Sequence, residues 1–162
     1  MKKFIHLLIL AAFLNSCTST KNYSNRKDAD NALQDVVQKL NKNSNNESAR
    51  KALPILYADV QHTHLANIKY FNAANKDRSY YWNDIILEYQ ALQNAYNTII
   101  NSSTAFKIVQ PTDYTITTGE TKEAAAEHFY QQALSILESP GRSNAKKSIH
   151  LLQNMRLLCS RL

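Results

Sequence analysis

Glycine, proline and cysteine are scarce in this chain. Its 162 residues include 2 Gly, 3 Pro and 2 Cys, while 44% of them are hydrophobic. So few turn-forming residues exclude a turn-rich β-sandwich, and so few cysteines exclude a small fold held by disulfides. The hydrophobic content also excludes a disordered tail. The length allows one domain at most, or a piece of one, and the composition predicts an all-α fold.

Charge is unevenly distributed along the chain. The net charge is +6, but residues 17–138 carry 12 basic and 13 acidic side chains, or about −1. From Ser139 onward there are five basic residues and no acidic one: Arg142, Lys146, Lys147, Arg156 and Arg161. Such a segment can contact anionic lipid or an acidic partner. Each basic side chain near a lipid surface contributes about 1 kcal/mol of binding free energy. The alternative is an ordinary solvated helix face.

The first 16 residues have the pattern of a secretion signal. Lys2 and Lys3 precede an apolar run, Phe4 to Leu14, which contains no charged residue. Eleven helical residues span about 16 Å, roughly half of a hydrocarbon core. The run is therefore too short for a permanent membrane anchor, and residues 1–16 are expected to be removed.

The end of this signal, Leu14-Asn15-Ser16-Cys17, resembles the lipobox of bacterial lipoproteins, in particular the looser boxes of Bacteroidetes. Asn15 departs from the small apolar residue that is usual there. The resemblance implies a diacylglyceryl thioether on Cys17 and an acylated amino terminus, so that membrane lipid is one partner. No run of acidic residues follows Cys17, and residue 18 is Thr and not Asp; by resemblance to known sorting patterns this implies the outer membrane, on its periplasmic side. The alternative is an incidental thiol after an ordinary signal.

Residues 17–27 are polar and are expected to form a flexible tether. Residues 28–101 have helical periodicity and are expected to contain a long antiparallel hairpin. A first helix is expected from Asp28 to Asn41, and Trp82 to Ile100 form the strongest pattern. A further helix is expected between these two, and Pro54 interrupts its pattern. This helix either begins near Leu53 or is kinked at the proline.

The helical period is lost in residues 102–119, which are expected to form an extended connector around Pro111. Residues 120–162 are expected to form a helix pair. Its first helix, Glu120 to Leu137, has acidic residues in its first turn, and Pro140 and Gly141 precede a second helix from Ser143 to about Cys159.

Two parts of the chain resemble halves of a tetratricopeptide repeat. Trp82, Ile85, Ile86 and Tyr89 match the offsets of its first helix, and Ala126, Tyr130 and Ala133 match those of its second helix. The halves are 36 residues apart and do not belong to one repeat, and Ile86 replaces a small residue. The layout resembles Bacteroidetes lipoproteins in which repeat-like helix pairs follow a lipobox and a helical hairpin. The alternative is that any amphipathic helix with Ala and Tyr meets such offsets.

The apolar end of the chain, without a capping helix, suggests a truncated sequence or a covering partner.

No cluster of residues has the pattern of an active site or a cofactor site. His62 and His64 are two residues apart on one helix and cannot bind one metal from one face. Asp84 and Glu88 share a helical face, where an exposed pair is the commoner arrangement. Cys159 is expected to be a small buried thiol. We therefore expect no enzyme activity, no metal or other cofactor, and no nucleic acid partner.

These features predict a lipid-anchored scaffold that binds an unidentified protein partner. The candidate contact residues are aromatic or basic: Tyr81, Trp82, Tyr89, Tyr96, Lys146 and Lys147. The rival prediction is a ligand-binding or cell-wall-binding lipoprotein with a pocket between the helical hairpin and residues 106–118. A closed apolar pocket would favour the rival, and an open groove would favour the scaffold.

Overall fold

The structure is a computed structural model that describes residues 28–73, 81–138 and 142–159. All regular structure in these ranges is helical, which confirms the predicted all-α class. The helices are α2 (Asp28–Lys42), α3 (Glu47–Ala73), α4 (Trp82–Ile100), α5 (Ser103–Phe106), α6 (Thr115–Leu137) and α7 (Arg142–Cys159). The predicted signal 1–16, the tether 17–27, and Pro140 with Gly141 lie outside the described residues.

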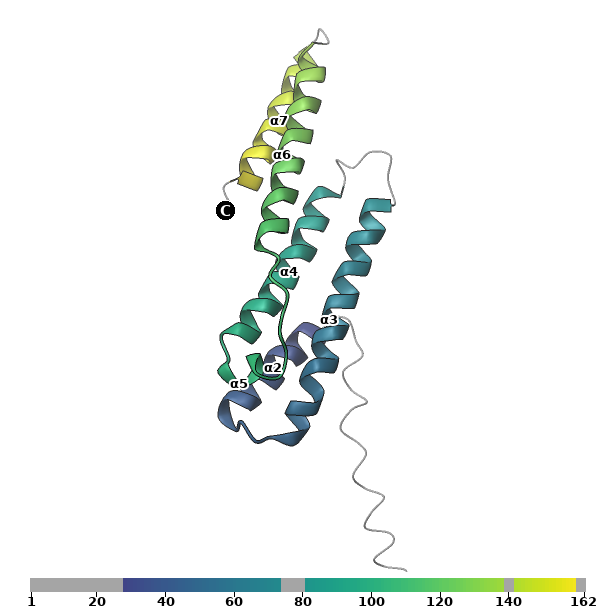
Figure 1. Ribbon diagram of the computed structural model, residues 1–162. Coiled ribbons are helices and arrows are strands. Elements are labelled where there is room, and N and C mark those ends of the chain that lie inside the picture. The colour runs from purple at the N-terminus through teal and green to yellow at the C-terminus, as the bar shows by residue number, and fades with distance from the viewer. Residues whose placement is uncertain (1–27, 74–80, 139–141, 160–162) are drawn as a thin grey trace, which may run out of the picture.

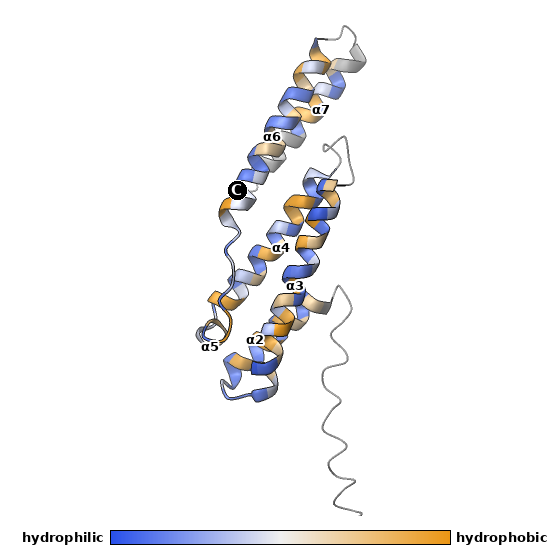
Figure 2. Cartoon of the chain, turned by 45° about the vertical axis from the view of Figure 1, so that its right-hand side comes forward, coloured by the Kyte–Doolittle hydropathy of each residue, from blue (hydrophilic) through white to orange (hydrophobic). Residues whose placement is uncertain are grey.

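The helices form an elongated molecule (Figure 1). Helices α3 and α4 pack side by side and run in opposite directions, with α2 and α5 at one end. Helix α6 begins beside α4 and continues past the far end of that helix, and α7 returns along it. Apolar and polar residues alternate around the helices (Figure 2), as expected where one side of a helix packs and the other meets solvent.

The largest core lies between α2, the first half of α3, the end of α4, and α5; we refer to it as the basal core. Six apolar residues of α2, spaced one, three or four residues apart, are buried there: Ala29, Ala32, Leu33, Val36, Val37 and Leu40. They pack against Leu53, Val60 and Ile99, which are almost inaccessible to solvent. Burying side chains of this size contributes roughly 1.5 to 3 kcal/mol each before conformational entropy.

Two smaller apolar clusters hold the rest of the molecule. The middle cluster joins α3 to α4 through Ile68, Ile85 and Leu92. The junction cluster joins α4, α6 and α7 and consists of Trp82, Ile86, Ala125 and Phe129, with Leu151 packed against them. The α6–α7 pair is therefore held to the body by its own small core, separate from the basal core.

The expectation of an extended segment over residues 102–119 is wrong at both ends. Ser102 caps α5 by accepting a hydrogen bond from the backbone N–H of Ala105. Helix α6 begins at Thr115 instead of Glu120, and no acidic residue lies in its first turn. Threonine is compatible with this helical start because its hydroxyl can bond the carbonyl one turn back, as Thr118 does with Tyr114 at 2.7 Å. Only residues 107–114 cross between the two helices without helical structure.

The proline in α3 does not mark the start of the helix. Helix α3 begins at Glu47 and continues through Pro54, which is exposed. The side chain of Asn46 accepts a hydrogen bond from the backbone N–H of Ala49 and caps this earlier start. None of the described helices is long and apolar enough to cross a membrane.

Candidate functional site

The α6–α7 pair carries an apolar surface that faces solvent. On α6, Tyr130, Leu134 and Leu137 follow one another at intervals of four and three residues, so they lie on one helical face. They are 40%, 37% and 53% exposed, and Ile149 on α7 is 55% exposed. We refer to these four residues as the distal patch. Grouped exposed apolar residues are typical of an interaction surface.

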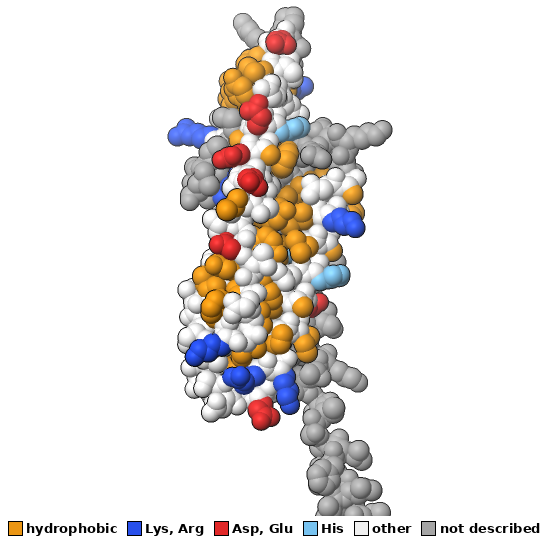
Figure 3. All heavy atoms as spheres, in the orientation of Figure 1, with side chains coloured by type: hydrophobic (Ala, Val, Ile, Leu, Met, Phe, Trp, Pro, Cys, Tyr) orange, Lys and Arg blue, Asp and Glu red, His pale blue; other side chains and the backbone are white. Residues whose placement is uncertain are grey.

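Opposite charges lie on the two helices of this pair. Helix α6 carries Glu120, Glu123 and Glu127 on its exposed side, and the described cations of α7, Lys146, Lys147 and Arg156, are exposed as well. Figure 3 shows the acidic side chains along the outer face of the molecule, with an apolar area near its upper end. Among the described residues, no salt bridge joins α6 to α7. These three acidic and three basic side chains are presented to solvent.

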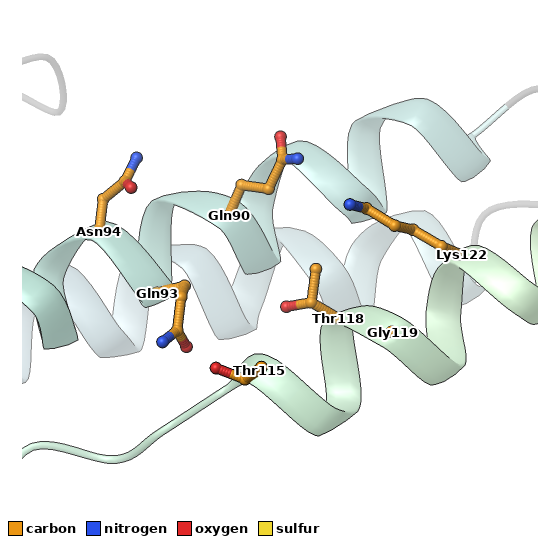
Figure 4. A pocket seen from close by; sticks show the side chains of 7 residues that line it. All are labelled: Gln90, Gln93, Asn94, Thr115, Thr118, Gly119 and Lys122. Carbon is orange, nitrogen blue, oxygen red and sulfur yellow. The ribbon is translucent and has the colours of Figure 1, made fainter. Parts of the chain in front are cut away.

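A polar cleft of about 370 Å³ lies between α4 and the start of α6. It opens to solvent and is lined by Gln90, Gln93, Asn94, Thr115, Thr118, Gly119 and Lys122 (Figure 4). Its position is beside the α3–α4 pair and the end of the 106–118 segment, which is where the rival prediction expects a pocket. Its open shape differs from the closed apolar pocket that would favour that rival.

Part of the cleft lining holds the protein together. The side-chain oxygen of Gln93 accepts a hydrogen bond from the backbone N–H of Tyr114 at 2.7 Å, and the Thr118 hydroxyl donates to the Tyr114 carbonyl. Asp113 accepts hydrogen bonds from the backbone N–H and hydroxyl of Thr115, and these bonds lower the pKa of the Asp113 carboxyl. Lys122 is buried, and its amino group points toward the side of the cleft that carries Gln90 (Figure 4).

The aromatic residues proposed from the sequence belong largely to the interior. Trp82 is 8% exposed and lies in the junction cluster, 6.1 Å from the ring of His128. Tyr81 stacks on Phe71 at 5.4 Å and, with Tyr89, packs against the middle cluster. Tyr96 is half-buried on α4. The structure thus spreads these four side chains over two clusters and α4, and does not gather them on one surface.

The basic pair proposed from the sequence is accessible. Lys146 and Lys147 are both exposed on α7. Cys17 and the side chain of Cys159 lie outside the described residues. Leu134, Leu137 and Ile149 of the distal patch are not among the residues proposed from the sequence. The signal for Leu134 and Leu137 is the surplus of apolar residues in 120–137, which exceeds what one buried face requires.

Sequence reasoning also missed a polar contact at the centre of the molecule. His64 of α3 lies 2.5 Å through Nδ1 from Glu88 of α4, and 3.3 Å through Nε2 from Asp30 of α2. Asn67 donates a further hydrogen bond of 3.0 Å to Glu88. The hydrogen bond to Asp30 raises the pKa of His64 above its usual 6.5, and it outweighs the opposing effect of burial; Glu88 raises the pKa further. Glu88 is thus 19% exposed and paired, which corrects the expectation of an exposed pair with Asp84.

This arrangement has a structural explanation. When His64 is protonated, both ring nitrogens donate to carboxylates, and three helices are tied together by charge. No group of His, Cys, Asp and Glu side chains in the described part of the chain has the arrangement of a metal site. His62, on the same helix, points to solvent.

Comparisons with protein families, with characterised proteins and with solved structures find no significant match to this chain.

Proposed function

We propose that this protein is a lipid-anchored envelope lipoprotein whose helical body serves as a protein–protein docking module. The observation that carries the docking role is the distal patch. Its four apolar side chains are exposed on the helix pair that projects beyond the rest of the body. The patch is flanked by charged residues, an arrangement typical of a contact surface with a polar rim.

The docking role is tested by site-specific cross-linking in cells. A photoreactive phenylalanine analogue at Leu134 is expected to capture a defined protein, identified by mass spectrometry. The same analogue at Lys69, an exposed position on α3, is the control and is expected to capture much less. Equal capture at both positions, or none at Leu134, would contradict the docking role.

The anchor is tested separately, by metabolic labelling with palmitate. Label is expected in the wild-type chain and is expected to disappear from Cys17→Ser, because the thioether sulfur is then missing. Cys159→Ser is the matched control and should keep the label. A labelled Cys17→Ser protein would show that the lipobox resemblance is misleading.

A second candidate function is favoured by the polar cleft, whose Gln90 and Asn94 amides can bond the hydroxyl and amide groups of a cell-wall fragment. The test is co-sedimentation with purified peptidoglycan sacculi. Gly119→Leu should reduce co-sedimentation by filling the cleft, since a Cβ at Gly119 meets nothing within 4 Å. Ala124→Leu, an exposed change on the same helix, should not reduce it. Absence of wild-type binding would remove this candidate.

A further inference from the structure

The distal patch and the charges around it lie on one face of the α6–α7 pair. On α6, Glu123, Glu127, Tyr130 and Leu134 are separated by three, four or seven residues, so they form one column along the helix. On α7, Ile149 and Arg156 are seven residues apart and form a second column. All six side chains are exposed.

A hydrogen bond fixes the register of these two columns. The Ser148 hydroxyl donates to the Ala133 carbonyl at 3.2 Å, so these two residues lie side by side. Because the helices run in opposite directions at about 1.5 Å per residue, each step back along α6 corresponds to one step forward along α7. Ile149 is then level with the segment between Tyr130 and Leu134. Arg156 is level with the segment between Glu123 and Glu127.

This register makes the face complementary to itself. A rotation of 180° about an axis parallel to the helices places α6 of one copy opposite α7 of another, at the same level. Each Ile149 then faces the apolar half of the other α6, and each Arg156 faces its acidic half. Pairing α6 with α6 would instead bring carboxylates together. The described part of α7 has cations and no acidic residue, so pairing α7 with α7 is disfavoured as well.

We infer that the partner on this face is a second copy of the same chain, paired so that α6 of each copy packs against α7 of the other. The result is a two-fold symmetric four-helix bundle made of two helix pairs. It covers the distal patch of both copies and places two cation–carboxylate contacts at its edges. This inference rests on the proposed docking function and names the partner.

The test uses the full-length chain in cells, with the photoreactive phenylalanine analogue at Ile149 and two differently tagged copies. A covalent product that carries both tags is expected. Mass spectrometry is expected to place the cross-link within residues 130–137 of the other copy. A cross-link confined to other regions would overturn the inference.

Charge reversal then tests the proposed register. Arg156→Glu places like charges opposite each other and is expected to reduce the two-tag product at least about tenfold, which corresponds to about 1.4 kcal/mol. Combining it with Glu123→Arg and Glu127→Arg restores opposite charges and is expected to recover most of the product. Lys147→Glu is the matched control: it reverses one α7 cation on the opposite side of the helix from Ile149 and should change the product less than about twofold.

The outcomes separate this inference from the docking function. Capture of a different protein at Leu134 and at Ile149, without a two-tag product, would overturn self-pairing and leave docking in place. No capture at either position would contradict both. Loss of product in Arg156→Glu without recovery in the triple variant would overturn the register, provided that the triple variant keeps the wild-type thermal transition.

Discussion

Individual polar side chains join elements that the apolar clusters leave separate. His64 is the main example, because it lies between a carboxylate of α2 and one of α4, while its own helix is α3. Its ring is 13% exposed, so water screens the contact less than it would a surface ion pair. The protonated ring is the form that both carboxylates favour.

The His64 contact predicts a stability that depends on pH. The pKa of His64 is raised in the folded protein, so its contribution is fully present below the unfolded value of about 6.5 and is lost as the pH rises through the folded value. His64→Gln should therefore reduce the free energy of unfolding by about 1.5 to 3 kcal/mol at pH 5, the range for hydrogen bonds to charged groups, and by less at pH 8. Urea unfolding at both values measures this.

The control for that measurement is His62→Gln, because His62 is exposed on the same helix. Its effect should be small and similar at the two pH values. If His64→Gln cost as much at pH 8 as at pH 5, the charged contact would not be the source of the stability.

Ser102 is a second residue whose loss should be costly. It is 2% exposed; its hydroxyl donates to Asn41 of α2 at 2.5 Å and accepts from the backbone N–H of Ala105. Ser102→Ala leaves both partners without this bond and should reduce the free energy of unfolding by about 1 to 3 kcal/mol. The neighbouring residue Ser103 is exposed and provides the control. Ser103→Ala should change the free energy of unfolding by less than about 0.5 kcal/mol. Thermal unfolding followed by circular dichroism distinguishes the two.

Neither residue could be assigned its role from the sequence. His64 is 34 residues from Asp30 and 24 from Glu88, and Ser102 is 61 residues from Asn41. Such contacts depend on how the helices are arranged, which periodicity along one helix does not reveal. The sequence indicates only that His62 and His64 face different directions, and this agrees with one exposed and one partly buried ring.

Among the secondary structure elements, the start of α6 depends on local hydrogen bonds. The threonine-rich stretch from Thr115 to Thr121 favours strands by propensity, yet it is helical. Asp113 holds the first turn, and Gln93 of α4 accepts from the N–H of Tyr114. Tertiary contacts and caps thus override a weak local preference.

Gly119 gives a prediction on this helix. It lies inside α6, a Cβ added there meets no atom within 4 Å, and glycine costs roughly 0.5 to 1 kcal/mol in a helix interior relative to alanine. Gly119→Ala should therefore raise the free energy of unfolding by about that amount, measured by urea denaturation. A decrease would indicate that the open cleft itself contributes to stability.

Helix positions were predictable where an apolar stripe repeats without interruption. The bounds of α4 match the stripe from Trp82 to Ile100, and α2 ends one residue past the predicted Asn41. The stripe fails at the start of α6, which begins at Thr115 and not at Glu120. For α3 the stripe left two starts open, and the structure has the earlier one, at Glu47, ahead of Pro54. The projecting α6–α7 surface was not predictable, because several apolar residues there are exposed instead of buried.

In the whole molecule, three separate clusters imply that parts of the fold can open independently. The α6–α7 pair is joined to the body mainly through the junction cluster, in which Phe129 is 5% exposed. The single tryptophan of the chain, Trp82, lies in the same cluster and reports on it by fluorescence.

Phe129→Ala should loosen the α6–α7 pair and leave the basal core intact. Removing a buried Phe costs about 3 to 5 kcal/mol, so the Trp82 fluorescence transition should move to lower urea. Hydrogen exchange at Leu53, in the basal core, should stay slow. Tyr130→Ala, an exposed change one residue away, should have little effect on either measurement. Faster exchange at both sites in Phe129→Ala would show that the molecule unfolds as one unit.

The position of Asp30 has a mechanical consequence. It lies in the first turn of α2, near the point where the described chain begins. A force pulling on the preceding residues would reach that turn first and load the imidazole contact that joins it to α3 and α4, before the apolar side chains of α2 begin to separate. Acid conditions keep His64 protonated and would therefore strengthen this contact. The force needed to detach α2 would then increase as the pH falls.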